Sequence, residues 1–145
     1  MTDIAAEREA VRSLIASVKY QKDCEDDPVA FGSLWAKNAT YVVESNGQIY
    51  GEASKSRDDV VAFNVKNWEA GAHGKGSAKE THLAEPPHIV DLGSGRYRAI
   101  YNIVMFGLVS GGYAPVGVGL FVDDCVKEDG AWKIYARRAK LRRPG

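Results

Sequence analysis

The segment from Lys79 to Gly107 is the feature that most constrains how this chain can fold. It contains two β-prone runs separated by the turn sequence Leu-Gly-Ser-Gly, which is typical of a β-hairpin. Successive side chains of a strand point to opposite faces. In the second run one face would carry Tyr97, Ala99, Tyr101, Ile103 and Met105, and the other Arg98, Ile100, Asn102, Val104 and Phe106. The first run adds His82. If these polar groups reach one cavity, the hairpin supplies the chemistry.

The remaining sequence places helices before this hairpin and long strands after it. Helical spacing and capping residues predict helices over residues 3–22, from Pro28, and from Ser56 to Glu69. Three glycines make Gly71–Ser77 a loop. Further strands are predicted over residues 39–44, 48–51, 115–127 and 131–141. This order predicts an α+β fold with helices packed on one side of a strongly curved, cone-shaped sheet, and such a cone can hold a small molecule.

Length and composition set further bounds. The chain has 145 residues, which predicts a single domain over residues 1–145. The formal net charge is zero, which argues against nucleic acid or an anionic membrane as the main partner. The sequence has no apolar N-terminal segment and no long apolar run, so a cytoplasmic protein is expected. Cys24 and Cys125 lack metal-ligand spacing, so no metal site is expected.

Several segments, in this order and spacing, resemble the SnoaL-like branch of the nuclear transport factor 2-like superfamily over nearly the whole chain. They are Val11, Leu14, Ile15 and Val18 ahead of Asp23; Leu34-Trp35-Ala36-Lys37-Asn38-Ala39-Thr40-Tyr41; Tyr50-Gly51 before the Ser56 helix; Thr81-His82-Leu83; and Asp129-Gly130-Ala131-Trp132-Lys133-Ile134 ending in Arg137. The resemblance implies the α+β barrel of that superfamily. It is less informative about activity, because this fold hosts many functions.

Within the superfamily, the nearest chemical parallels are the scytalone dehydratase, bile-acid dehydratase and hexachlorocyclohexane dehydrochlorinase types. These use a His–Asp pair inside the cone without a metal or an organic cofactor. The resemblance puts His82 and Asp23 at the positions of that pair, Arg137 at an active-site arginine, and Asn102 at a second polar position. One extra residue between Asp23 and Leu34 leaves Cys24 or another residue as an alternative partner. On a straight helix, Lys22 and Glu25 would also follow Val18 inward better than Asp23.

The pair predicts a cofactor-independent lyase that eliminates water or another small group, or releases it by retro-aldol cleavage. Asp23 would fix the tautomer of His82, and the other ring nitrogen would accept a proton. Arg137 would stabilise developing negative charge, and Asn102 would orient the substrate. A flat or aromatic substrate is expected from four aromatic side chains that could line the cavity. These are Tyr20, Trp35, Tyr41 and Trp68.

Other interpretations of these residues stay open. His82 could be structural, and Asp23 could simply end its helix. Arg137 could pair with Asp123 or Asp124 across the last hairpin, and Asn102 could satisfy a backbone group. Most tyrosines could belong to the core. The two other histidines, His73 and His88, are expected to be exposed.

Other functions fit the same fold. An isomerase or polyketide cyclase would use the same base without a leaving group. A ligand carrier or the small subunit of an oxygenase would need no active site. Epoxide hydrolysis is disfavoured because it needs an Asp–Arg–Asp arrangement that no matching positions supply. The outer face of the sheet predicts a homodimer, with a trimer as the alternative.

Overall fold

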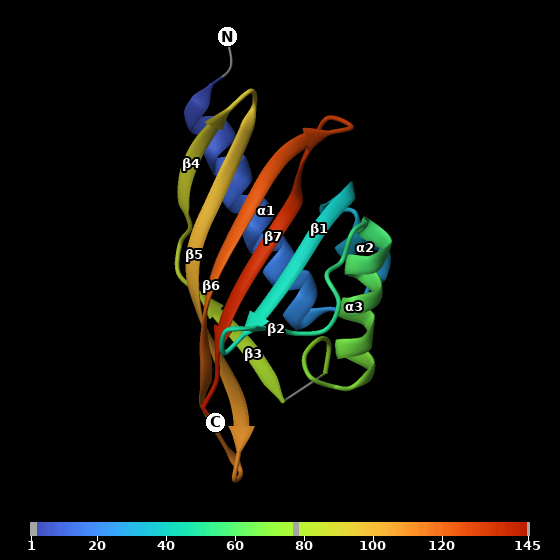
Figure 1. Cartoon of the computed structure of the whole chain (residues 1–145), viewed down its shortest axis with the longest axis vertical. Coiled ribbons are helices and arrows are strands. Elements are labelled where there is room, and N and C mark those ends of the chain that lie inside the picture. The colour runs from blue at the N-terminus through green and yellow to red at the C-terminus, as the bar shows by residue number, and fades with distance from the viewer. Residues whose placement is uncertain (1–2, 77–78, 145) are drawn as a thin grey trace.

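Three helices pack against one curved sheet in the computed structural model, which describes residues 3–76 and 79–144 (Figure 1). The helices are α1 (Ile4–Cys24), α2 (Pro28–Gly32) and α3 (Arg57–Glu69). The strands are β1 (Trp35–Ser45), β2 (Gln48–Ile49), β3 (Glu80–Ala84), β4 (His88–Gly93), β5 (Arg96–Val109), β6 (Gly112–Glu128) and β7 (Ala131–Arg142).

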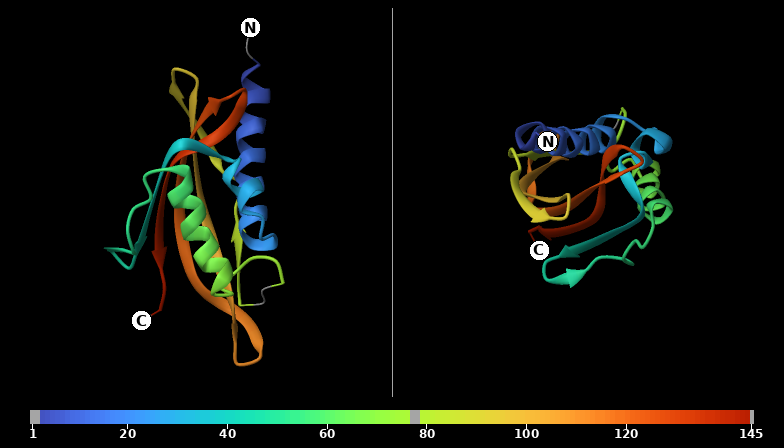
Figure 2. Two further views of the ribbon diagram at one scale, coloured as in Figure 1. Left: turned by 90° about the vertical axis from the view of Figure 1, so that its right-hand side faces the viewer. Right: turned by 90° about the horizontal axis from the view of Figure 1, so that it is seen from above.

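The sheet has the order β2-β1-β7-β6-β5-β3, and β4 also pairs with β5. All neighbouring strands are antiparallel except β1 and β7, which are parallel. Seen from above, the sheet curls round from β4 and β5 to β1, while α1 lies across its open side and α3 lies beside β1 (Figure 2). The expected α+β architecture, with helices packed on a strongly curved sheet, is therefore confirmed.

The first helix forms where apolar residues recur every three or four positions. Asp3 caps it by accepting hydrogen bonds from the backbone of Ala5 and Ala6 at 3.0 and 3.2 Å. Its buried stripe faces the sheet and contains Val11, Leu14, Ile15 and Val18, with Asp23 in the last turn. The stripe thus fixes which side of α1 points into the cone.

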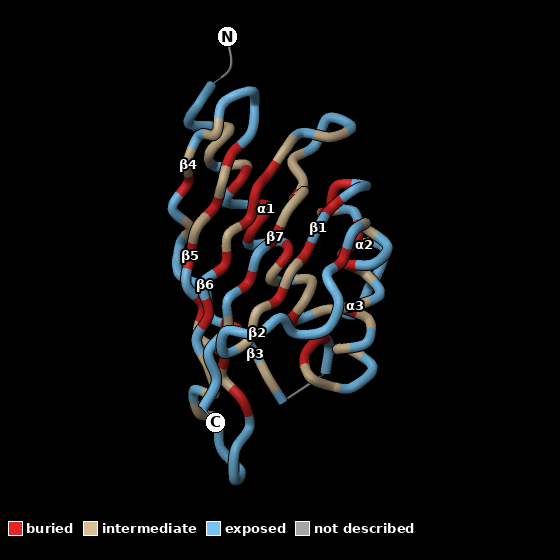
Figure 3. The backbone as a smooth tube through the Cα atoms, in the orientation of Figure 1, coloured by how far each residue is buried: buried red, intermediate tan, exposed pale blue. Residues whose placement is uncertain are grey.

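The long strand β5 has the alternation that its sequence predicts. Tyr97, Ala99, Tyr101, Ile103 and Met105 are all buried on the concave face. The tube in Figure 3 shows buried and less buried positions alternating along the central strands. Asn102 is exposed on the opposite face. The expectation that Asn102 points into the cone is therefore wrong, because α1 packs against the other face of β5 and makes that face the concave one.

The first run of the predicted hairpin is two strands rather than one. The chain leaves the sheet after Ala84 and returns at His88, because Pro86 and Pro87 have no N–H for a β-ladder. Both strands pair with β5, and His82 lies opposite Met105. This register turns His82 toward the concave face, where it is 7% exposed.

One other boundary differs from expectation. Phe31, Leu34 and Trp35 have the spacing of the apolar face of one short helix, but α2 ends at Gly32 and Trp35 begins β1. Residues 71–76 form the expected loop, whereas Ser77, which was assigned to it, lies outside the described residues. Among the described residues, no helix has the length and apolar character needed to cross a membrane.

Candidate active site

The last turn of α1 and strand β3 bring Asp23 and His82 into direct contact. Nδ1 of His82 lies 2.9 Å from Oδ1 and 3.1 Å from Oδ2 of Asp23, and the backbone N–H of His82 donates to Oδ2 at 2.9 Å. Both side chains are buried. Burial alone would raise the pKa of Asp23, but the hydrogen bonds from His82 outweigh it and hold that pKa below its usual value. Asp23 is thus an ionised carboxylate that orients the imidazole.

The alternative partners of His82 lie elsewhere. Cys24 is exposed, and the Glu25 carboxylate accepts a hydrogen bond from Tyr20 at 2.6 Å. Asp23 also lies 3.8 Å from the ammonium of Lys19, one helical turn earlier. The structure therefore brings Asp23 to His82, and not Cys24.

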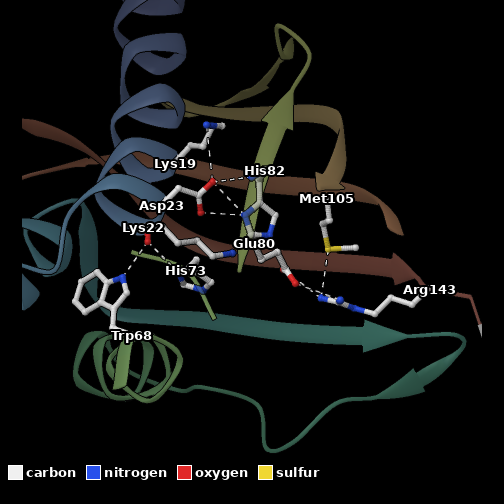
Figure 4. A network of polar contacts seen from close by, with 9 residues as sticks. All are labelled: Lys19, Lys22, Asp23, Trp68, His73, Glu80, His82, Met105 and Arg143. Atoms are coloured by element: carbon white, nitrogen blue, oxygen red, sulfur yellow. Dashed lines mark hydrogen bonds and ion pairs between the residues drawn. The ribbon is translucent and has the colours of Figure 1, made fainter. Parts of the chain in front are cut away.

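Two side chains hold the end of α1 in this orientation. The backbone carbonyl of Lys22 accepts hydrogen bonds from Nε1 of Trp68 and from Nδ1 of His73, both at 2.9 Å. Carbonyls in the last turn of a helix lack partners within the helix, so these donors satisfy a group that would otherwise need water. Figure 4 shows both rings beside the Lys22 carbonyl and Asp23 directed at His82.

The buried state of His73 corrects the expectation that it is exposed. It is 4% exposed, and its ring centroid lies 5.9 Å from that of His82. Burial, together with the nearby charge of Lys22, lowers its pKa to about 4. His73 is therefore a neutral hydrogen-bond donor at neutral pH. His88 is exposed as expected.

A second carboxylate faces the other nitrogen of His82. Oε1 of Glu80 lies 3.4 Å from Nε2 of His82, and the same carboxylate accepts two hydrogen bonds of 3.3 Å from Arg143. The contact with His82 and the charge of Arg143 lower the pKa of Glu80 to about 2. Sequence reasoning missed Glu80, although the two-residue period of a strand puts it on the same face as His82.

The interior of the cone contains two cavities that meet at His82. The first cavity, about 250 Å³, lies between α1 and the sheet and is bordered by Asp23 and Arg137. The second, about 360 Å³, lies toward β1 and α3 and is bordered by Tyr41 and Glu80. The residues that border both are Lys22, His82 and Phe121. Nδ1 of His82 contacts Asp23, which borders the first cavity, whereas Nε2 contacts Glu80, which borders the second. From these neighbours we infer that Nε2 faces the second cavity.

Arg137 is part of a buried ion pair. Its Nε and one terminal nitrogen donate to the two oxygens of Asp123 at 2.7 and 2.9 Å, and it also donates to the Tyr101 hydroxyl at 3.1 Å. Burial alone would lower the pKa of Arg137, but the charge of Asp123 outweighs it and raises that pKa well above its usual value. The alternative interpretation, pairing across the last hairpin, is thus what the structure shows. The guanidinium still borders the first cavity.

The residues expected to bind substrate are only partly placed for it. Tyr41 borders the second cavity. Trp35 is 1% exposed and borders only a void of about 10 Å³ within the core. Trp68 packs against Phe31 with ring centroids 5.8 Å apart and lines neither main cavity. Tyr20 is 50% exposed.

Asn102 forms hydrogen bonds with Glu85 on the outer side of the sheet. Its backbone N–H and side-chain amide donate to Oε1 of Glu85 at 2.7 and 2.9 Å. These bonds anchor the segment between β3 and β4 at the point where Pro86 interrupts pairing. Asn102 therefore supports the strand that carries His82 from outside the cone.

The arrangement is suited to moving a proton at a buried imidazole. A carboxylate fixes one imidazole nitrogen, and the second nitrogen faces a cavity bordered by aromatic side chains. Within residues 3–76 and 79–144, no cluster of three or more His, Cys, Asp or Glu side chains is placed to hold a metal ion.

Comparison with known proteins assigns the chain to a family. A model of the SnoaL-like domain matches residues 3–138. A sequence comparison with curated proteins gives no significant match. This match includes all the segments in which the sequence resembles the SnoaL-like branch, from Val11 to Arg137.

Solved structures share the fold at low sequence identity. An NTF2-like protein with a cystatin-like fold from Novosphingobium aromaticivorans aligns with a TM-score of 0.75 and 21% identity over 95% of this chain and 83% of its own. The β subunit of a candidate aromatic-ring-hydroxylating dioxygenase from the same organism gives 0.76 and 16%, over 99% and 94%. A candidate scytalone dehydratase from that organism gives 0.72 and 16%, over 94% and 85%.

These neighbours agree on architecture and differ in the activities that their names state. Since the family model covers nearly the whole described chain and the neighbours share its curved sheet, the protein is a member of the SnoaL-like domain family with the nuclear transport factor 2-like fold.

Proposed function

We propose that this protein is a cofactor-independent lyase that eliminates water or a similar small group from a small cyclic or aromatic substrate. The observation that carries the proposal is the buried contact of 2.9 Å between His82 Nδ1 and Asp23, with the other ring nitrogen facing a cavity. The structural similarity to a candidate scytalone dehydratase supports the same class of reaction.

The chemistry follows from the two nitrogens of His82. Nδ1–H donates to Asp23, so the lone pair of the neutral ring lies on Nε2. Nε2 removes a proton from the carbon adjacent to the one that bears the leaving group, and Asp23 stabilises the resulting imidazolium. The imidazolium then returns the proton to the departing hydroxyl, which leaves as water. General acid–base catalysis of this kind contributes roughly 10²–10⁴-fold.

The second cavity suits the substrate because Nε2 faces it. Its volume of about 360 Å³ lies at the lower end of the range of roughly 300–1,000 Å³ for small-molecule sites. Aromatic and apolar side chains border it, including Tyr41, Phe63 and Met105. Charged side chains border it as well, namely Lys22, Glu80 and Arg143. This lining favours a flat ring that carries a polar group.

Glu80 must move for this reaction to occur, because its carboxylate occupies the position next to Nε2. Arg143 offers an alternative partner for it, since the two already form hydrogen bonds of 3.3 Å. Substrate entry would therefore break the Glu80–His82 contact and keep the Glu80–Arg143 hydrogen bonds.

A suitable probe is 3-hydroxy-1-tetralone, a bicyclic β-hydroxyketone that becomes 1-naphthol on loss of water. We expect the protein to accelerate formation of 1-naphthol, measured by its absorbance, and His82→Ala to abolish the acceleration. His88→Ala is the matched control, because His88 is the exposed histidine on the next strand. Equal rates for wild type and His82→Ala, with both folded, would refute the proposal.

A second candidate function is a non-catalytic ligand-binding module, as the similarity to a dioxygenase β subunit suggests. The observation that favours it is the Glu80 carboxylate 3.4 Å from Nε2, which closes the base to a ligand. Binding of the tetralone without product in wild type and in Glu80→Ala would support this second function over the first.

A further inference from the structure

Lys22 places a half-buried cation inside the cone. It borders both cavities, and its ammonium lies 5.8 Å from the centroid of the Phe121 ring. Figure 4 shows its side chain extending from α1 toward His82 and Glu80. Within residues 3–76 and 79–144, no carboxylate lies within 4 Å of this ammonium. The charge of Lys22 still acts on Asp23 and helps to lower the pKa of that carboxylate, but the ammonium itself is in contact with the Phe121 ring.

The carboxylates around Lys22 already have other cations. Asp23 lies 3.8 Å from Lys19 in addition to its contact with His82. Glu80 lies 3.3 Å from Arg143. Of the charged residues that border the second cavity, Lys22 and Arg143 are cations and Glu80 is a carboxylate, so the cavity has an excess positive charge.

The position of Lys22 is fixed by the same contacts that orient Asp23. Its backbone carbonyl accepts hydrogen bonds of 2.9 Å from Trp68 and His73. The side chain starts from this held turn and runs along Phe121 into the interior. The side chain of Lys22 is only half-buried, and an anion that reaches its ammonium gains a charge-assisted hydrogen bond.

We propose that Lys22 binds the carboxylate of a small cyclic or aromatic acid, with the ring of the ligand against the aromatic lining of the second cavity. This inference deepens the proposed function and rests on it for the choice of cavity. It narrows the substrate from a cyclic molecule to one that carries a carboxylate. Arg143, half-exposed at the rim beside Glu80, gives an anion a favourable route inward.

The test compares two ligands of the same shape, 2-naphthoate and neutral 2-naphthamide, by isothermal titration calorimetry at neutral pH. We expect wild type to bind the naphthoate more tightly, by roughly tenfold to a hundredfold, as a charge-assisted hydrogen bond provides. Lys22→Met should reduce naphthoate affinity to that of the amide and leave amide binding unchanged. Lys22→Arg should keep the preference.

Two controls make the result specific. Lys66→Met removes the same charge from an exposed position on α3 and should change nothing. Unchanged binding of the amide to Lys22→Met shows that the variant is folded. Equal affinities of wild type for the two ligands, no binding of either, or a preference that survives in Lys22→Met would overturn the proposal.

The same titration with His82→Ala separates this inference from the proposed function. If His82→Ala keeps the naphthoate preference but wild type has no lyase activity, the anion site stands and the catalytic proposal fails. If wild type dehydrates the tetralone but binds both naphthalene ligands equally, the reverse holds.

Discussion

Glu80 and His82 form a contact of 3.4 Å between Oε1 and Nε2, on the ring nitrogen that Asp23 does not use. His82 therefore has a carboxylate at each nitrogen. A neutral imidazole has one N–H and can donate to only one of them, whereas the imidazolium donates to both. The Glu80 contact is thus strongest when His82 is charged, and it links the site to the stability of the protein in acid.

We expect Glu80→Gln to flatten the acid dependence of stability. The pKa of Glu80 is lowered from 4.5 to about 2, so its ionised form stabilises the fold above pH 4.5 and this contribution is lost as the pH falls toward 2. Wild type should lose on the order of 1–2 kcal/mol across that window, after allowance for partial exposure. Urea titrations at several pH values measure this. Glu52→Gln, at an exposed site, should behave like wild type, and an equal loss in Glu80→Gln would contradict the assignment.

His73→Asn should remove a separate acid sensitivity at higher pH. Burial lowers the pKa of His73 to about 4 from 6.5, so the unfolded chain takes up the proton first. Stability should fall as the pH drops from 6.5 through 4, by about 3 kcal/mol in all. An asparagine amide can replace Nδ1–H as the donor to the Lys22 carbonyl but does not titrate.

The measurement is again the free energy of unfolding between pH 7 and 4. His88→Asn, a change of the exposed histidine, is the matched control. A slope in His73→Asn as steep as that of wild type would show that His73 is not the group responsible.

The sequence predicted the fold well because its main signals are local. Turn pairs such as Asn46-Gly47 and Asp129-Gly130 adopt the positive φ values that such sequences favour, and the alternation in β5 is strict. Asn102 was misplaced because both faces of β5 carry apolar residues, and only the packing of α1 decides which is concave. The local pattern therefore predicted the strand β5 but not which of its faces points into the cone.

The site was less predictable because contacts distant in sequence fix it. Helical period alone favoured Lys22 or Glu25 over Asp23, and the turn is held instead by Trp68 and His73. His73 lies in a glycine-rich loop with no periodic signal that would indicate burial. Glu80, by contrast, could have been predicted from sequence, because the two-residue period of a strand puts it on the same face as His82.

We expect Asp23→Asn to impair catalysis by His82 without weakening substrate binding. The amide keeps the size of the side chain but loses the charge that stabilises the imidazolium, so kcat for the tetralone should fall by roughly 10²-fold or more while KM changes little. Ring nitrogen chemical shifts should report a changed tautomer of His82. Asp58→Asn, at an exposed carboxylate, should leave both unchanged. A variant of unchanged kcat would mean that Asp23 only ends α1.

Arg137 offers a test of a structural against a catalytic role. Its ion pair with Asp123 is completely buried, with the Tyr101 hydroxyl bonded to both partners. Arg137→Met leaves the Asp123 charge unpaired and should lower the free energy of unfolding by about 3–5 kcal/mol. The triple variant Arg137→Met, Asp123→Leu, Tyr101→Phe replaces the whole group by apolar side chains and should recover most of that stability. Thermal unfolding measures both.

Because Nε2 of His82 faces the second cavity and Arg137 borders the first, the triple variant should dehydrate the tetralone within about tenfold of the wild-type rate. A folded triple variant without activity would instead assign the guanidinium to transition-state stabilisation.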